Sequence, residues 1–289
     1  MGKIRIGVSG WSYQDWRGHF YPETVTRVDE LRYAAGIFDT IEVNGTFYSL
    51  STPDAFRSWH SAAPSGFVFA VKGSRYITHS KKLNRVETPL ANFFASGILD
   101  LGSKLGPVLW QLPASLHFDA ERVNRFLGLL PKDTIEASNL AGRHDDKVKS
   151  ISYGSNRKHR LRHVLEIRHE SYLSDELVRI ARDHGVALAF SHASTWPYLE
   201  ELTAGFAYVR LHGPGEPYRS PYGDAIKVWA RKLRAWHRGS EPEEPQRISD
   251  RVPPRRKERD VYVYLDNDAG GHAPKEAQAL RFEVDRLLE

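Results

Sequence analysis

Residues 163–172 read HVLEIRHESY, a segment with the length and apolar content of a buried strand that nevertheless carries charges. In an extended chain alternate side chains point the same way, so Val164, Glu166 and Arg168 share one face. Burying a charged pair is unfavourable unless the charges are paired or face water. Two interpretations follow: an antiparallel sheet with one wet face, or a strand whose polar face lines a cavity.

Six other segments show the same pattern, in which one set of alternate residues is apolar and the other set ends with a polar or charged residue. One further segment has the character of a strand. The eight expected strands are residues 4–9, 40–44, 67–72, 107–112, 163–172, 187–191, 208–212 and 261–265. Helical patterns separate most of them, which indicates parallel pairing, and eight such units in about 250 residues is the size of a closed barrel. An open doubly wound sheet competes, but its central strands are apolar on both faces. We therefore predict an α/β fold, a closed (β/α)8 barrel of the TIM type.

Length and composition define the class of protein. The 289 residues predict one barrel domain over residues 1–289, with excursions after the third, fourth and seventh strands and a flexible, charged, Pro-rich loop at residues 239–260. Cysteine is absent, which excludes disulfides, thiolate metal sites and a cysteine nucleophile. There is no run of 18 apolar residues and no signal-peptide core, so we expect a cytoplasmic protein that does not enter a membrane.

The positive charge is concentrated in two short runs. The formal net charge is +5, and much of the excess lies in residues 156–163 and 254–259. Such runs are either solvated basic loops or contacts for an anionic partner, and we expect that partner to be a small anionic ligand or nucleic acid. The sequence leaves the oligomeric state open.

Polar residues of the inward phase gather where the strands end. Barrel enzymes place their sites at this carboxyl-terminal mouth. The inward, mouth-side residues are Ser9, Glu42, Asn44, Lys72, Gln111, Glu166, Arg168, Ser191, Arg210, His212, Tyr264 and Asp266. So many buried polar groups are unfavourable for stability, and this favours a functional mouth over a purely structural one.

The residue types suggest roles. We predict that Glu42 or Glu166 is a general base and that Lys72, Arg168 and Arg210 hold an anion, because a group of fixed cations suits phosphate or carboxylate. The predicted catalytic residues are Glu42, Lys72, Glu166, His212 and Asp266. The predicted substrate-binding residues are Trp11, Tyr13, Asn44, Tyr48, His79, Gln111, Arg168, His169, Arg210, Asn267, Gly270 and Gly271. The glycine pair precedes a helix start, where barrels often bind phosphate.

Two further kinds of chemistry stay open. Several histidines fall at or beyond strand ends, and together with Glu42, Glu166 and Asp266 they have the donor atoms for a divalent metal. No ligand spacing supports such a site, so we assign no metal ligand and leave the cofactor undetermined. Lys72 has the chemistry for a Schiff base, although a lysine beside acids more commonly forms an ion pair.

Several segments together resemble the YecE-like family, domain of unknown function 72. They are GVSGWSYQDWRGHFYP, FDTIEVNGTFYSL, GFVFAVKGSRYITH, KLGPVLWQLP, EIRHESY, YVRLHGP and VYVYLDNDAGGHAPKEA. They occur in order from Ile6 to about Leu280 and so cover nearly the whole chain. The resemblance implies a TIM-type barrel, in agreement with the strand count, and implies no reaction.

We therefore expect an enzyme, a hydrolase or an isomerase, that acts at the mouth on an anionic sugar phosphate, nucleotide or nucleic acid. Phosphoester hydrolysis or transfer fits the cations, and isomerisation of a sugar fits the acid and base groups equally. A non-catalytic nucleic-acid-binding module is the alternative from another class, and it would show steep salt dependence and no turnover.

Overall fold

Strands and helices alternate along the chain as predicted. The strands are β1 Ile4–Ser9, β2 Thr40–Val43, β3 Val68–Lys72, β4 Leu105–Gln111, β5 His163–Glu166, β6 Ala187–Leu188, β7 Phe190–His192, β8 Phe206–Leu211 and β9 Asp260–Leu265. The α-helices are α1 Glu30–Ile37, α2 Gly45–Tyr48, α3 Pro53–Ala62, α4 Glu87–Ala95, α5 Ala120–Leu129, α6 Thr134–Ala141, α7 Asp175–His184, α8 Ala225–His237 and α9 His272–Leu288. The computed structural model describes residues 2–289.

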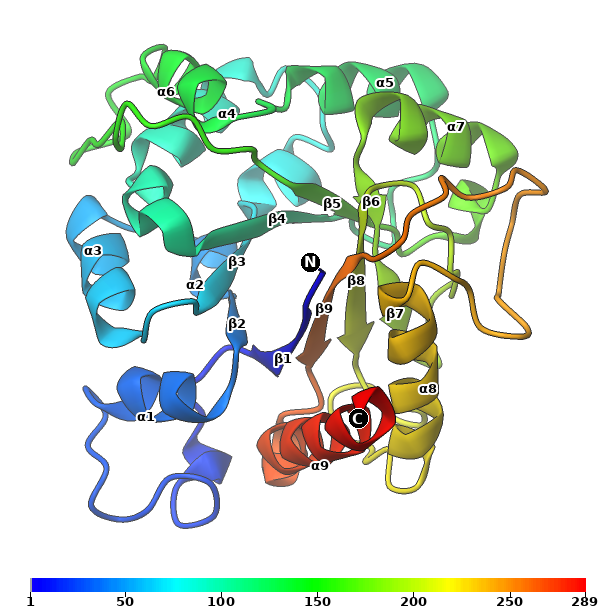
Figure 1. Cartoon of the computed structure of the whole chain (residues 1–289). Coiled ribbons are helices and arrows are strands. Elements are labelled where there is room, and N and C mark those ends of the chain that lie inside the picture. The colour runs from blue at the N-terminus through cyan, green and yellow to red at the C-terminus, as the bar shows by residue number, and fades with distance from the viewer. Residues whose placement is uncertain (1) are drawn as a thin grey trace.

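The strands form a parallel ring that closes through one interrupted segment. In residues 2–289 they pair in the order β6-β5-β4-β3-β2-β1-β9-β8-β7 (Figure 1). The two end strands, β6 and β7, follow one another in the chain with only Ala189 between them. Residues 187–188 pair with β5, and residues 190–192 pair with β8. The predicted barrel is therefore confirmed, with the sixth expected strand divided in two.

The expected strand ends agree with the structure to within two residues, apart from the fifth strand. That strand was expected over residues 163–172 but ends at Glu166. The following residues turn instead, because Nδ1 of His169 accepts the N–H of Ser171 at 3.1 Å and opens a 3-10 turn over Glu170–Tyr172. The turn leaves Arg168 beyond the sheet, although still on the inward side.

The predicted inward phase fills the barrel. Leu165, Val209 and Val263 are buried on the outer face and pack in the layer between strands and helices. The inner core consists of Val68, Ala70, Leu109, Val164, Ala187, Ala189, Ala204, Phe206, Tyr208, Tyr262 and Tyr264. These side chains occupy the amino-terminal part of the lumen, so the polar residues one step further along each strand lie at the carboxyl-terminal mouth.

Helix ends follow from capping residues. The Ser174 hydroxyl accepts the N–H of Leu177 at 3.2 Å and begins α7. Gly185 ends the same helix with φ of 65°, in the left-handed region that glycine adopts without strain. Among the helices of residues 2–289, none has both the length and the apolar content needed to cross a membrane.

The segment between α8 and β9 contains neither helix nor strand, yet two buried carboxylates attach it to the barrel. Oε1 of Glu201 accepts the N–H groups of Ile248 and Ser249 at 2.7 and 2.8 Å, and Oε2 of Glu200 accepts that of Gln246 at 3.1 Å. This segment contains the predicted charged loop at residues 239–260. Its flexibility stays a prediction.

Gly7 allows β1 and β2 to approach within the barrel wall, because an added Cβ would lie 1.7 Å from the carbonyl oxygen of Thr40. We expect Gly7→Ala to lower the free energy of unfolding by at least about 2 kcal/mol, since backbone must move to accommodate the methyl group. Gly36→Ala, in exposed α1 with no atom within 4 Å of the added Cβ, is the matched control and should be neutral or stabilising. Urea denaturation measures both, and equal stabilities would contradict the packing at Gly7.

Candidate active site at the barrel mouth

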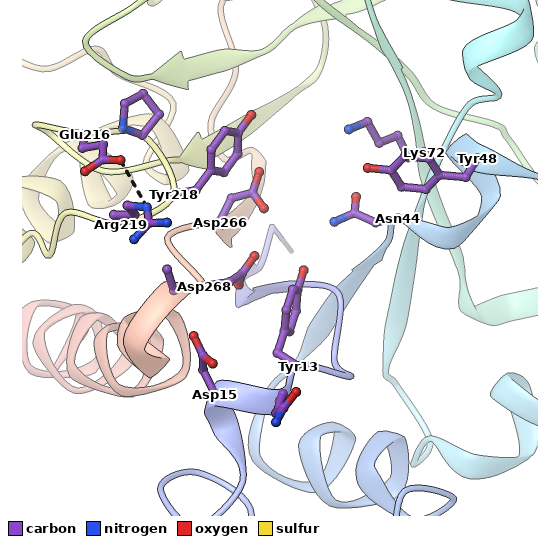
Figure 2. A pocket seen from close by; sticks show the side chains of 13 residues that line it. Tyr13, Asp15, Asn44, Tyr48, Lys72, Glu216, Tyr218, Arg219, Asp266 and Asp268 are labelled. Carbon is purple, nitrogen blue, oxygen red and sulfur yellow. Dashed lines mark ion pairs between the residues drawn. The ribbon is translucent and has the colours of Figure 1, made fainter.

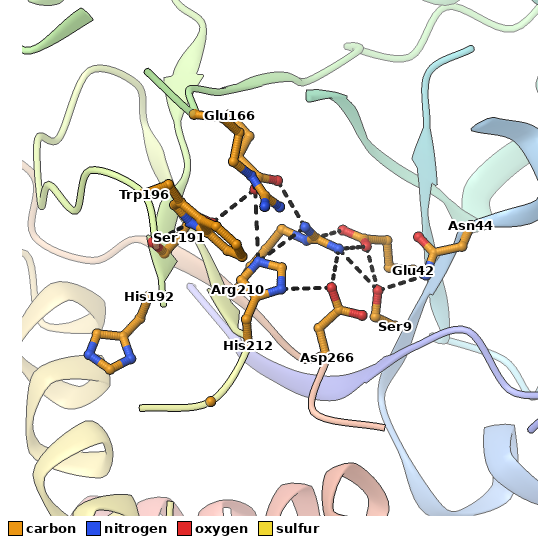
Figure 3. A network of polar contacts seen from close by, with 12 residues as sticks. Ser9, Glu42, Asn44, Glu166, Ser191, His192, Trp196, Arg210, His212 and Asp266 are labelled. Atoms are coloured by element: carbon orange, nitrogen blue, oxygen red, sulfur yellow. Dashed lines mark hydrogen bonds and ion pairs between the residues drawn. The ribbon is translucent and has the colours of Figure 1, made fainter. Parts of the chain in front are cut away.

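Three carboxylates surround the guanidinium of Arg210 at the mouth (Figure 3). Arg210 lies near the carboxyl-terminal end of β8 and is 1% exposed. Its Nη2 donates to Oε1 of Glu42 and to Oδ2 of Asp266, both at 2.7 Å, and its Nη1 donates to Oε2 of Glu166 at 2.9 Å. The strands β2, β5, β8 and β9 thus bring together four residues that the sequence predicts for the site.

Neighbouring hydroxyl groups satisfy the remaining oxygens of these carboxylates. Glu42 accepts the hydroxyl hydrogens of Ser9 at 2.6 Å and of Tyr208 at 2.5 Å. Glu166 accepts that of Ser191 at 2.9 Å. Buried ions remain stable only when they are paired and fully hydrogen-bonded, and this cluster meets both conditions.

Arg168 is also engaged within the protein. Its Nε donates to Oε1 of Glu166 at 2.6 Å, and its guanidinium carbon lies 3.5 Å from the ring centre of Trp196. The indole N–H of Trp196 in turn donates to the Ser191 hydroxyl at 3.0 Å. Burial raises the pKa of Glu166, but Arg168 and Arg210 outweigh this effect and hold that pKa well below its ordinary value.

His212 is neutral, and its surroundings define the tautomer. Arg210 has only donors, so Nε2 of His212 must accept from Nη1 of Arg210 at 3.2 Å. The proton then lies on Nδ1, which is 2.8 Å from Oδ2 of Asp266. Burial and the charge of Arg210 lower the pKa of His212 to about 4. His212 therefore positions Asp266 at neutral pH.

A pocket of about 690 Å³ opens above this cluster (Figure 2). Its lining residues are Tyr13, Gln14, Asp15, Asn44, Tyr48, Lys72, Glu216, Pro217, Tyr218, Arg219, Asp266, Asp268 and Ala269. Five of the sequence-predicted site residues are among them: Tyr13, Asn44, Tyr48, Lys72 and Asp266. Glu42, Glu166, Arg210 and His212 lie beneath the pocket and do not line it.

Lys72 is the cation of this pocket that has no carboxylate partner. Its side chain comes from the end of β3 and the residue is 9% exposed. Among residues 2–289 no carboxylate oxygen lies within 4 Å of its Nζ, which instead lies 4.3 Å from the ring centre of Phe47. Burial and the charge of Arg210 lower the pKa of Lys72 to about 8. Just above neutral pH, Lys72 is therefore a neutral amine in a sizeable fraction of the protein molecules.

Two aspartates on the opposite side of the pocket have pKa values displaced in opposite directions. Burial raises the pKa of Asp266, but Arg210 and His212 outweigh this effect and keep it well below its ordinary value. Burial and the charge of Asp266 raise the pKa of Asp268 well above its ordinary value. In the described part of the chain, Oδ1 of Asp268 is buried without a hydrogen-bond partner. Asp266 is thus a fixed charge, and Asp268 is a carboxyl group able to carry a proton.

Three predicted residues lie near the mouth without lining the pocket. His79 packs against Phe47 with ring centres 5.0 Å apart, and burial together with Lys72 lowers its pKa to about 4. Gln111 ends β4 directly beside Glu166 of β5. His169 follows Arg168, and its Nδ1 lies 2.9 Å from Oγ of Ser171.

The remaining predicted residues lie elsewhere. Trp11 packs edge-on against Trp59, with ring centres 5.6 Å apart. Asn267 is fully buried and donates to the carboxylate of Glu276 at 2.8 Å, which holds the start of α9. Gly270 and Gly271 line a second pocket of about 610 Å³ next to α1 and α9. Within residues 2–289 no group of three histidine, aspartate or glutamate side chains is arranged to hold a metal ion.

The basic runs lie at the other end of the barrel. Residues 156–163 lead into β5, and residues 254–259 lead into β9, so both precede the amino-terminal ends of strands. There Arg5 and Arg162 both pair with Asp260, at 3.5 and 2.7 Å, beside a groove of about 290 Å³. The positive excess of the sequence is therefore separated from the mouth pocket.

Several charged residues that line the pocket were not predicted from the sequence. Asp15, Glu216, Arg219 and Asp268 line the pocket but were not predicted. One signal was available: Asp268 follows Asp266 by two residues and so continues the inward phase of β9 past the strand end. Asp15 lies in a short 3-10 helix, Gln14–Trp16, and the other two lie in a loop, where no periodicity indicates direction.

The chain matches proteins of one family over nearly its whole length. The family model described as "Protein of unknown function DUF72" matches residues 5–287. The UPF0759 protein YecE of Escherichia coli strain K12 is 24% identical over 248 residues, which cover 83% of this chain and 84% of YecE.

Solved structures of two DUF72 family proteins have the same fold. The protein from Thermotoga maritima MSB8 superposes with a TM-score of 0.72 at 22% identity, over 99% of both chains. The protein from Enterococcus faecalis V583 superposes with a TM-score of 0.66 at 14% identity, over 98% of this chain and 96% of that one. Both likenesses concern the barrel architecture.

Removing one buried charge should destabilise the mouth. Glu166→Gln leaves Arg168 and Arg210 with a weaker partner, and we expect the free energy of unfolding at pH 7 to fall by roughly 1 to 4 kcal/mol. The double change Glu166→Leu, Arg168→Met removes one charge of each sign and should be less destabilising. Urea denaturation compares the three proteins. A single variant as stable as the parent would mean that Glu166 is solvated rather than paired.

Acid should weaken the fold before the carboxylates titrate. His163 and His212 are fully buried, and burial lowers the pKa of each to about 4. The unfolded chain binds these protons near pH 6.5 and the folded chain only near pH 4, so the free energy of unfolding should fall as pH falls across this interval. His212→Asn should reduce the slope, as measured by urea denaturation at half-unit steps of pH. Identical slopes in parent and variant would show that His212 titrates normally.

Proposed function

The chain belongs to the DUF72 family, and we propose that it is an enzyme that transfers protons on a small hydroxycarbonyl compound, such as a sugar phosphate, in the mouth pocket. One observation carries the proposal: Lys72 and Asp268 line the same pocket, and their pKa values are displaced in opposite directions, each towards neutrality. Groups tuned in this way suit general acid–base catalysis near physiological pH.

Each group has a defined task in this proposal. Asp268 keeps its proton because the fixed charge of Asp266 lies beside it, and it gives that proton to the substrate oxygen. Lys72 activates the carbonyl group from the other side of the pocket (Figure 2). Once Asp268 has lost its proton, its carboxylate is basic enough to take one from the carbon next to the carbonyl group. These two steps give an enediol. Asp268 then delivers its proton to the former carbonyl carbon and takes back the hydroxyl proton of the neighbouring carbon, so that the net change is an isomerisation and Asp268 ends protonated.

The lining suits a polar, ring-sized substrate. Oδ1 of Asn44 has no hydrogen-bond partner in the described part of the chain and can accept from a substrate hydroxyl group. Tyr48 is 70% exposed, with a face available to a sugar ring. The volume of about 690 Å³ lies within the usual range for small-molecule sites. At the rim, Arg219 pairs with Glu216 at 3.1 Å in an exposed position, from which it can turn to an anionic group.

Proton transfer has more support here than phosphoester hydrolysis. Transfer of a phosphoryl group relies on cations that surround the phosphate oxygens. The guanidinium groups of Arg168 and Arg210 are already bonded to Glu166, Glu42 and Asp266. The proposal therefore assigns the anion-holding role to Arg219, in place of Arg168 and Arg210, and the base role to Asp268, in place of Glu42 or Glu166.

Hydrogen exchange tests the proposal without knowledge of the natural substrate. Dihydroxyacetone phosphate, glyceraldehyde 3-phosphate and ribose 5-phosphate, each beside its unphosphorylated counterpart, are incubated with the protein in D2O. Proton NMR should show deuterium entering the carbon next to the carbonyl group of at least one compound. We expect Asp268→Asn to slow the exchange by about 100-fold or more, in line with the usual worth of a general acid–base group.

The control for this exchange experiment is Asp54→Asn, which removes a 92% exposed carboxylate on α3 and should leave exchange unchanged. Exchange no faster than in buffer for every compound would overturn the proposal. So would an Asp268→Asn variant that retains the parent rate.

A further inference from the structure

We propose that Lys72 activates its substrate covalently, by forming an imine with an aldehyde or ketone group. This inference rests on the proposed function and specifies how its carbonyl compound is held. The amine needed for it comes from the end of β3 into the mouth pocket.

Comparison with the other buried lysine shows what is unusual about Lys72. Lys104 is equally buried, at 9% exposure, but its Nζ donates to the carbonyl oxygens of His60 and Ala63 at 2.5 and 2.6 Å. Lys104 thus has a structural role, in which its protons are used by the backbone. In residues 2–289 Nζ of Lys72 makes no hydrogen bond and no ion pair, and it faces an open pocket.

The surroundings of Lys72 favour the neutral amine, which is the nucleophilic form. The Phe47 ring lies 4.3 Å from Nζ and excludes water on that side. Arg210 contributes a like charge, and a desolvated lysine close to another cation is a recognised form of activated amine.

The reaction balances with groups that are present. Nζ of Lys72 attacks the carbonyl carbon, and the carbonyl oxygen takes the proton of Asp268. The resulting carbinolamine passes a proton from nitrogen to the Asp268 carboxylate, and its hydroxyl group takes that proton and leaves as water, so that the imine is protonated and Asp268 is again a carboxylate. The product is a C=N bond, with one water released and no oxidant or reductant consumed. The imine nitrogen withdraws electrons from the neighbouring carbon, which makes its proton easier for Asp268 to remove.

Reductive trapping tests the imine directly. The full-length protein is incubated with pyridoxal 5′-phosphate, or with dihydroxyacetone phosphate, and then reduced with sodium borohydride. Peptide mass spectrometry should find the adduct at Lys72 with each probe and not at Lys104. Labelling of Lys72 should increase as pH rises through about 8, the range in which its side chain becomes a neutral amine.

Two variants separate covalent from electrostatic action. Lys72→Met should lose the adduct, and Lys72→Arg should also lose it while keeping the positive charge. If the D2O exchange occurs, both variants should lose it by at least 100-fold. Thermal melts confirm that each variant is folded, and labelling of exposed lysines provides a signal even if a variant is less stable.

The outcomes distinguish the two proposals. Exchange without any adduct at Lys72, or full exchange by Lys72→Arg, would overturn the imine and leave proton transfer standing. An adduct at Lys72 without exchange of any compound would support the reactive amine and overturn the proposed isomerisation. Labelling spread evenly over exposed lysines, with Lys72 unmodified, would overturn the imine.

Discussion

The pairing of Arg210 with Glu42, Glu166 and Asp266 is the interaction on which the mouth depends. Burying any one of these charges alone inside a barrel would be strongly unfavourable. Burying them together changes the free energy little, because each charge has partners of opposite sign. Arg168 and Arg210 both pair with carboxylates of this group, and this leaves Lys72 as a cation without a carboxylate partner. Of the cluster, only Asp266 lines the pocket in the described part of the chain, whereas Glu42, Glu166 and Arg210 do not.

The lumen of the barrel divides into two parts with different physical tasks. The amino-terminal part is filled by apolar and tyrosine side chains, which supply the hydrophobic stabilisation. The carboxyl-terminal part holds ions whose net contribution to stability is small. Tyr208 joins the two parts, because its ring packs in the inner core while its hydroxyl donates to Glu42. A rigid lower layer thus orients the charged layer above it.

The sequence was sufficient to predict the fold and the residues that point into the barrel. It was not sufficient to predict which of these residues pair with one another. Alternation along β5 placed Glu166 on the inward face, since a period of two is enforced by the sheet. Arg168 lies beyond the strand end and contacts Glu166 from there. The alternation did not reveal that Arg168 and Arg210 would be saturated by carboxylates, because pairing depends on distances between strands far apart in the chain. Asp268 and Arg219 lie on loops, whose directions are decided by tertiary contacts rather than by a local period.

The pairing of β1 with β9 has a consequence for how the protein is made. Ile4 lies beside Val261, so β1 is synthesised long before its second neighbour, β9, exists. Until then its edge is open to unintended strand partners. Ser9, on that first strand, and Asp266, just after the last, meet around Arg210 only at this point. The ion-pair cluster is therefore complete only after β9 has joined β1 and β8.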